Sequence, residues 1–133
     1  MAGVRVERTP DRVAATVTVL HGEAGLTARA ERPPGELAGV WAAAEATAAA
    51  LGQILPAGVA ATLRRVVVQQ VAAGPLVVVH LAVETGRGAE NLVGAALGRG
   101  GPLEDAAAAA VVDAVERRLE WYLRQQTGPA AGR

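Results

Sequence analysis

The sequence contains no cysteine, serine, lysine or phenylalanine. Without cysteine the chain has no disulfide framework, no thiolate metal site and no thiol nucleophile, and its redox compartment is left open. The missing serine excludes a serine hydrolase. Aromatic residues make up only 2% of the chain, so Val, Leu, Ile and Ala must fill the core. Because these side chains are small, we expect the helices to approach the sheets closely.

Neither sign of charge dominates the chain. Thirteen arginines offset 13 acidic residues, which gives a net charge of +0 at pH 7. Proteins that bind nucleic acid or membrane surfaces usually carry a basic patch, so we expect neither partner. No apolar run reaches the roughly 20 residues that a membrane-spanning helix needs, and the first residues lack the apolar segment of a signal peptide. We therefore expect a cytoplasmic location.

A chain of 133 residues with 51% hydrophobic content is long enough for one core and too short for two ordinary domains. We expect a single domain over residues 1–133. Alternating apolar and polar residues predict a first set of three strands, at residues 4–8, 12–21 and 26–31. Pro33 and Pro34 have no backbone N–H to donate to a neighbouring strand, so they end this set of strands. Apolar residues at spacings of three and four then predict a helix over residues 36–55.

The same order of elements occurs a second time. Runs rich in β-branched residues predict strands at 61–71, 75–84 and 89–97, and an alanine-rich helix follows the glycine cluster that begins at Gly98. At an offset of 66 residues Leu37 falls on Leu103, as expected of an internal duplication. We predict an α+β fold of two βββα units, residues 4–55 and 61–126, related by pseudo-two-fold symmetry. The antiparallel sheets carry helices on one face, and residues 127–133 form a disordered tail.

Both faces of the strand at 75–84 are largely apolar, although one face of a small antiparallel sheet should be solvated. If helices cover one face, a self-complementary homodimer would cover the other. The alternative is a central strand covered on both sides within one chain. Trp121 falls outside the apolar stripe of the last helix, so it either covers a sheet edge or marks a contact surface. The predicted interface residues are Leu76, Val78, His80, Ala82 and Trp121.

With two histidines and no cysteine, the chain has too few of zinc's preferred ligands, so we expect no metal and no cofactor. His21 is typical of a loop, and His80 of an interface or a satisfied core position. Four carboxylates could form acid–base pairs: Glu84, Glu90, Glu104 and Asp105. The last two lie in the first turn of a helix, where negative charge favours the helix dipole. No set of nucleophile, base and orienting residue is visible, so we expect a protein that is not an enzyme.

The stretch "GRGGPLEDA", residues 98–106, changes from a glycine cluster to a helix start. A phosphate-binding P-loop requires a lysine and a hydroxyl residue that are absent here. The GxxG loop of RNA-binding KH domains joins two helices, whereas this loop follows a strand. The structural interpretation places Pro102 at the first helical position and Glu104 and Asp105 in the first turn. Backbone N–H groups at a helix start also attract carboxylates, but these two acids would repel an anion.

The longer stretch "ALGRGGPLEDA", residues 96–106, followed by an alanine-rich helix, resembles the leucine-binding regulatory domain of 2-isopropylmalate synthases and their citramalate synthase relatives. The resemblance implies a dimeric pair of βββα units that holds a small carboxylate or amino-acid effector near the helix starts. It places the ligand-binding residues at Gly98, Gly100, Gly101, Pro102 and Ala106. The first unit departs from the pattern, because "RPPG" at residues 32–35 lacks the glycines. The sequence contains no catalytic barrel, so the resemblance implies a regulatory module and not a synthase.

These observations lead to the hypothesis of a non-catalytic small-molecule-binding or regulatory module that forms a homodimer. The alternative is a structural or protein-interaction subunit that uses the apolar sheet face and Trp121 without any ligand. A third possibility is a small enzyme whose site lies at a dimer interface around His80 and Glu84. The sequence leaves all three open.

Overall fold

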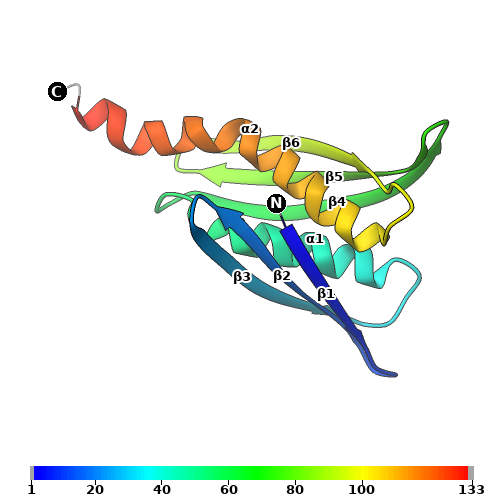
Figure 1. Ribbon diagram of the computed structural model, residues 1–133. Coiled ribbons are helices and arrows are strands. Elements are labelled where there is room, and N and C mark those ends of the chain that lie inside the picture. The colour runs from blue at the N-terminus through cyan, green and yellow to red at the C-terminus, as the bar shows by residue number, and fades with distance from the viewer. Residues whose placement is uncertain (1, 132–133) are drawn as a thin grey trace.

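The computed structural model describes residues 2–131, with the side chains of 120, 123 and 125–131 outside the description (Figure 1). It contains six strands and two helices, which follow the predicted order of βββα twice. The elements are β1 (Ala2–Arg8), β2 (Val13–His21), β3 (Ala24–Arg32), α1 (Ala38–Gly52), β4 (Ala60–Val71), β5 (Gly74–Thr85), β6 (Gly88–Leu97) and α2 (Leu103–Ala131). The predicted α+β fold class is therefore confirmed.

The strands form two separate antiparallel sheets, with the orders β1-β2-β3 and β4-β5-β6. The register of β2 with β3 recurs in that of β5 with β6. Val13 of β2 pairs with Arg32 of β3, and Val77 of β5 pairs with Ala96 of β6, so both partners are shifted by 64 positions (13 to 77 and 32 to 96). Such a match in strand pairing supports the duplication that the sequence predicts, although β2 and β3 correspond to β5 and β6 at an offset of 64 and not 66.

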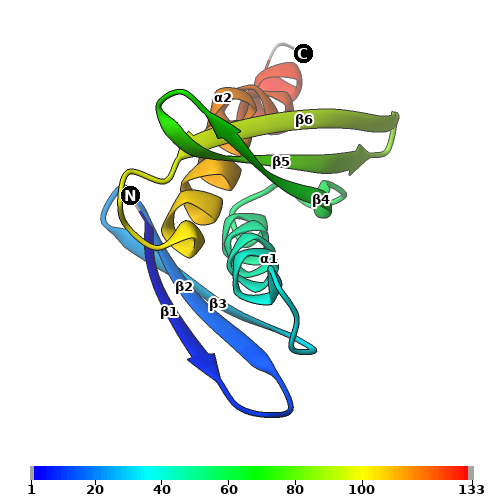
Figure 2. The same cartoon turned by 90° about the vertical axis from the view of Figure 1, so that its right-hand side faces the viewer.

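The two helices lie between the two sheets (Figures 1 and 2). Helix α1 packs on β2 and β3, α2 packs on β5 and β6, and the helices contact each other in the middle of the molecule. Each helix also reaches the other unit, because α1 contacts β4 and α2 contacts β1. Each sheet thus has helices packed on one face, and its other face points outward, away from the helices.

Small side chains fill the layer between the sheets, as the composition predicts. Helix α1 is buried almost all round, with Ala42, Ala43 and Ala44 fully inaccessible to solvent. Such a helix is apolar on every side because it is covered by a sheet and by a second helix. The hydroxyl of Thr47, a polar group in this core, donates a hydrogen bond to the carbonyl oxygen of Ala43 at 2.7 Å. Because of this hydrogen bond, the Thr47 hydroxyl can be buried without losing a partner.

The helices differ in length from the prediction. Helix α1 was expected over residues 36–55 but ends at Gly52, because the next three N–H groups each donate to the carbonyl three residues earlier, at 3.1–3.3 Å, in a tighter 3₁₀-type turn. Helix α2 continues to Ala131, so the expected disordered tail at 127–133 is helical over 127–131, and residues 132–133 lie outside the description. Gly128 and Pro129 disfavour the interior of a helix, so the composition of residues 127–131 does not account for this extension.

Within the described part of the chain, neither helix combines the length and apolar character that crossing a bilayer requires.

Candidate functional site

The glycine loop between β6 and α2 has structural reasons for its glycines. The N–H of Gly98 donates to the carbonyl of Pro75 at 2.8 Å, and a Cβ at Gly98 would lie 2.9 Å from the side chain of Leu103. Gly100 has a φ of +76°, a left-handed conformation that favours glycine. Close packing and a tight turn therefore account for two of the predicted ligand-binding glycines.

The start of α2 already carries a charged partner. Glu104 forms an ion pair with Arg8 of β1 at 2.7 Å, and this pair lies directly over Gly39, near the start of α1. The carboxylate of Glu104 is largely shielded from solvent, so an incoming anion would meet its negative charge. Gly101 and Pro102 are exposed, whereas Ala106 is part of the core. The five predicted ligand-binding residues thus lie together at one helix start, where Arg99 is an exposed positive residue that forms no ion pair among the described residues.

The predicted interface residues of β5 do share one face. Val77, Val79, Leu81 and Val83 face the helices and are 0–1% exposed. Strand alternation sends the intervening residues to the outer side of the sheet. The interface residues of β5 that lie there are Leu76, Val78, His80 and Ala82. Nε2 of His80 forms a hydrogen bond with Oδ1 of Asn91 at 2.9 Å, which satisfies the imidazole on this surface.

The outer surface of the second sheet, here called the outer β4–β6 face, carries apolar side chains on all three strands. Its polar members are Thr62, Arg65, Gln69, His80, Glu84 and Asn91. The register places Val67 of β4 opposite Val78, and Val93 and Ala95 of β6 on the same side. Val93 is 55% exposed, the most exposed large apolar side chain of the described residues. The apolar members of the face are Val67, Leu76, Val78, Ala82, Val93, Ala95 and Leu97. Ala82 is only 5% exposed, so this predicted interface residue offers little contact surface.

The outer β1–β3 face of the first sheet has the opposite character. At an offset of 64 residues, Val93 and Ala95 correspond to Arg29 and Glu31, which form an ion pair with each other. The polar members of this face are Arg5, Glu7, Thr16, Thr18, Thr27, Arg29 and Glu31. Its large apolar side chain is Leu20 of β2, which is 53% exposed. The fold therefore does not require an apolar outer face, because the first unit keeps the same architecture with a polar one.

Trp121 does not join the other predicted interface residues. It lies on α2, on the helix side of the sheet, and is 40% exposed. The guanidinium carbon of Arg118 lies 4.5 Å from the centre of the Trp121 ring, within cation–π range. The ring of Tyr122 meets Trp121 edge-on, with 5.3 Å between the ring centres.

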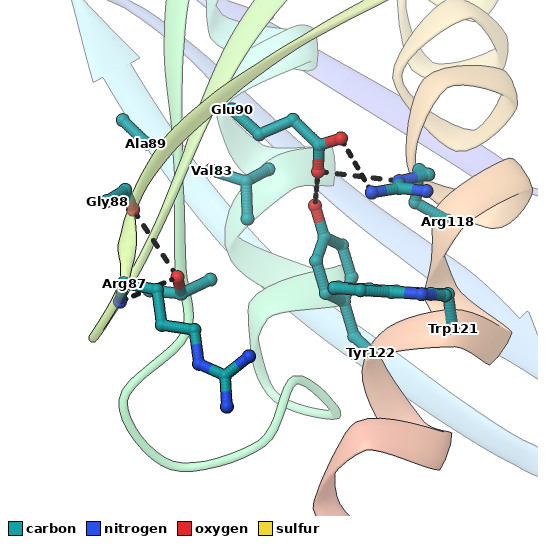
Figure 3. Close-up of a pocket in the computed structure, with 9 residues that line it drawn as sticks. Val83, Arg87, Gly88, Ala89, Glu90, Arg118, Trp121 and Tyr122 are labelled. Atoms are coloured by element: carbon teal, nitrogen blue, oxygen red, sulfur yellow. Dashed lines mark hydrogen bonds and ion pairs between the residues drawn. The ribbon is translucent and has the colours of Figure 1, made fainter.

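Trp121 and Tyr122 line two adjoining cavities of about 200 and 310 Å³, here together called the hairpin hollow (Figure 3). Its walls come from the β5–β6 hairpin, from α2 and from residues 56–59, which follow α1. Both cavities share Thr85, Arg87 and the two aromatic residues of α2. None of the residues predicted for the glycine-loop site lines either cavity.

One wall of the hollow is a hydrogen-bonded network around Glu90. The hydroxyl of Tyr122 donates to Oε1 of Glu90 at 2.6 Å, and Nη2 of Arg118 donates to Oε2 at 2.6 Å (Figure 3). The hydrogen bond from Tyr122, joined by Arg118 and opposed by burial, lowers the pKa of the Glu90 carboxyl below its ordinary value. Burial, together with the bond to Glu90, raises the pKa of Tyr122 to about 12. The wall is thus an ionised Glu–Arg pair with a neutral phenol.

The opposite wall carries Arg87, in the two-residue loop between β5 and β6 (Figure 3). Its backbone N–H donates to the hydroxyl of Thr85 at 3.1 Å, which fixes the loop. Among the described residues its guanidinium forms no ion pair or hydrogen bond, whereas the guanidinium of Arg118 is held by Glu90. Arg87 is therefore the unbalanced charge of the hollow.

The hollow exists because the two units diverge at this end of the molecule. At an offset of 64, Glu90 replaces Leu26, which is buried in the first unit, and Arg87 replaces Glu23. Helix α2 has 29 residues and α1 has 15, so Trp121 lies on a part of α2 that has no counterpart in α1. The part of the lining that comes from the hairpin and from α2 is therefore specific to the second unit.

Two observations bear on the metal and catalytic sites that the sequence raised. No group of three or more potential metal-ligating side chains converges among the described residues. His80 and Glu84, the pair considered for an enzyme at a dimer interface, lie four residues apart on one strand, which separates them by roughly 13 Å. Within one chain they are too far apart to share a proton.

The sequence reasoning missed most of the hollow. Glu90 was considered as one of four carboxylates, but its partners Arg118 and Tyr122 and the free Arg87 were not. The signal was a charged residue at an inward position of a strand, where the first unit has a leucine. Glu90 aligns with Leu26 only at the strand offset of 64. The alanine-rich helices do not reveal this offset, because alanines align with one another at many offsets.

No protein-family model matches the chain, and no curated protein matches it in sequence. Its function is therefore inferred from the geometry of these two surfaces.

Proposed function

We propose that the protein is a non-catalytic regulatory module that forms a homodimer, and that two copies join through the outer β4–β6 face. The observation that carries this proposal is the contrast between the two outer faces. Where the first unit has Arg29 and Glu31, the second has Val93 and Ala95, without any change in the fold that holds them. Contiguous exposed apolar surface on a soluble protein is typical of an interaction site.

The size and symmetry of the face favour a second copy as its occupant. Three strands about 4.8 Å apart, with about ten residues of about 3.4 Å each, give a face of roughly 500 Å². Two copies would bury roughly 1,000 Å², the lower end of the range for specific interfaces. We therefore expect a reversible dimer that dissociates on dilution.

The charges of the face also suit a two-fold dimer. Arg65 lies opposite His80 on the outer side, and Glu84 lies at the far end of the same face. Neither side chain forms an ion pair among the described residues. In a two-fold interface each contact occurs twice, so Arg65 of one copy can approach Glu84 of the other.

Two further observations support a regulatory role without catalysis. The pKa of Glu90 is lowered and that of Tyr122 is raised, so both move away from neutral pH, where a general acid or base should titrate. The two βββα units are also the architecture that the resemblance to the regulatory domains of 2-isopropylmalate synthases implies, and we retain that relationship as a proposal.

The proposal is tested by giving the second unit the residues of the first. In Val93→Arg with Ala95→Glu, both changes lie on the outer surface and place an ion pair where Arg29 and Glu31 stand in the first unit. We expect the unmodified protein to be dimeric by size-exclusion chromatography with light scattering, and this variant to be monomeric with an unchanged circular dichroism spectrum.

The matched control is Thr18→Arg with Thr27→Glu, which adds the same charges at exposed positions of the outer β1–β3 face. This control should dimerise like the unmodified protein. A variant at Val93 and Ala95 that still dimerises would refute the proposed interface, and a control that turns monomeric would move the interface to the first sheet.

A further inference from the structure

We propose that the hairpin hollow binds a small aromatic carboxylate, with its carboxylate on Arg87 and its ring against Trp121. The inference deepens the proposed function, on which it rests only in treating the protein as a non-catalytic module. It does not need the dimer, because the hollow lies on the helix side of the second sheet and the proposed interface lies on the outer side.

The charge of the hollow selects an anion. Among the residues that line the hollow, the acidic one is Glu90. Its negative charge is neutralised by Arg118, which donates hydrogen bonds to it at 2.6 and 3.4 Å. The positive charge of Arg87 is left over. A guanidinium is a planar fork of donors that matches the two oxygens of a carboxylate.

The remaining walls select a flat apolar body. Arg118 covers one face of the Trp121 ring, and Trp121, which lines both cavities, is 40% exposed. Pro56, Ala57 and Val59 add an apolar side to the larger cavity. Aromatic rings bind each other by offset or edge-to-face contact, so a ring of the ligand can use the free side of the indole.

The larger cavity of the hollow has room for a single aromatic ring. The larger cavity measures about 310 Å³, at the lower end of the roughly 300–1,000 Å³ that ligand sites span. This volume suits a monocyclic acid. The network that holds Arg118 to Glu90 also fixes Trp121 in advance, which reduces the ordering that binding requires.

The two tryptophans of the chain allow a direct test with an internal control. Trp41 also carries an arginine, because the Arg32 guanidinium carbon lies 4.6 Å from its ring centre and Arg32 pairs with Glu45 at 3.0 Å. Trp41 lines neither cavity of the hollow. It therefore reports any unspecific effect of an anion on an arginine-stacked tryptophan.

The experiment titrates sodium benzoate into ¹⁵N-labelled protein at constant ionic strength and follows the two indole N–H signals, assigned with Trp41→Phe. We expect a saturable shift of the Trp121 signal, in the millimolar range, with the Trp41 signal unchanged. Benzyl alcohol and acetate, which each lack one half of the ligand, should bind more weakly. Equal shifts of both indole signals, no saturation, or benzyl alcohol binding as tightly as benzoate would each overturn the proposal.

Variants locate the carboxylate. Arg87→Gln should weaken benzoate binding about tenfold or more, because a charge-assisted bond is lost. Arg99→Gln is the matched control in the exposed glycine loop, and it should leave the affinity unchanged. If Arg99→Gln abolishes binding and Arg87→Gln does not, the site is the glycine loop and the present assignment is wrong.

The dimer and the ligand site are separated by one more variant. Val93→Arg with Ala95→Glu should bind benzoate with unchanged affinity, because both changes lie across the sheet from the hollow. Retained binding in a monomer supports two independent surfaces. Binding lost together with the dimer would contradict the assignment of the hollow within one chain, whatever the fate of the proposed interface.

Discussion

At Gly94 the strand β6 approaches α2 so closely that no side chain fits between them. A Cβ built on Gly94 would overlap the backbone oxygen of Ala110 and lie 2.8 Å from the Cβ of Ala114. The obstacle is helix backbone, which cannot rotate out of the way as a side chain can. The helix would have to move away from the sheet.

We predict that Gly94→Ala lowers the free energy of unfolding by about 1–3 kcal/mol, the usual cost of overpacking a core. Gly101→Ala is the control, because Gly101 is exposed, has no left-handed φ and has no heavy atom within 4 Å of a Cβ. It should change stability by less than about 0.5 kcal/mol. Urea unfolding measures both. Equal stability of the two variants would show that α2 does not pack on Gly94 as described.

The Glu90 network gives a second prediction at this scale, in its dependence on pH. Tyr122→Phe removes the hydroxyl that lowers the pKa of Glu90 and should destabilise the protein by about 1 kcal/mol near neutral pH, since the pair is partly exposed. The folded pKa of Glu90 lies below the ordinary 4.5, so this stability is present above 4.5 and is lost as the pH falls through the folded value.

The difference between Tyr122→Phe and the unmodified protein should therefore shrink in acid. At the alkaline end, the folded pKa of Tyr122 is raised from 10.0 to about 12. The unmodified protein should lose stability as the pH rises through that interval, and Tyr122→Phe should not. Urea unfolding at a series of pH values measures both limbs. A difference that stays constant from acid to alkali would contradict the network.

At the scale of elements, α2 protects the free edge of β6. The N–H of Ala95 donates to Oδ2 of Asp113 at 3.3 Å, and Nη2 of Arg117 donates to the carbonyl of Val93 at 2.5 Å. These two backbone groups belong to the edge strand of the second sheet. Unpaired groups on an edge strand are a template for pairing with another chain, so two side chains of the helix block that pairing.

We predict that Asp113→Ala with Arg117→Ala increases aggregation on heating, because it frees the β6 edge. Glu116→Ala, at an exposed acid on the same turn of α2, should behave like the unmodified protein. Light scattering during a temperature ramp compares the three. The prediction fails if the double variant scatters no earlier than the Glu116 variant.

The elements themselves were largely predictable from the sequence. Alternation in the run from Val13 to Val19 predicts a strand with one buried face, and the structure confirms it. The end of α1 was not predictable, because the apolar spacing continues through Leu55 while the hydrogen bonds change to a 3₁₀ pattern at Gln53. Side-chain periodicity does not distinguish these two patterns over a single turn.

The candidate site was much less predictable, because its parts lie far apart along the chain. Arg87 and Glu90 are in or beside a hairpin, and Arg118, Trp121 and Tyr122 follow about thirty residues later on a helix. Periodicity places each of them on an element but does not say which elements meet. The composition of the glycine loop suggests a ligand site, although close packing explains Gly98 and a left-handed φ explains Gly100.

At the scale of the whole molecule, two units of one topology have come to differ in two places. The outer face of the second sheet has exchanged charged residues for apolar ones, and the far end of α2 has gained a hollow that the first unit does not share. Both changes lie on the second unit and on opposite sides of its sheet. We infer that the first unit mainly completes the fold and that the second carries the contacts with other molecules.

Sedimentation equilibrium of the unmodified chain over a range of micromolar concentrations tests this account most directly. We predict a mass that rises with concentration toward twice the 13.5 kDa of the chain, and that stays at 13.5 kDa in Val93→Arg with Ala95→Glu. A mass of 13.5 kDa for the unmodified chain at every concentration would contradict the claim that the outer β4–β6 face joins two copies.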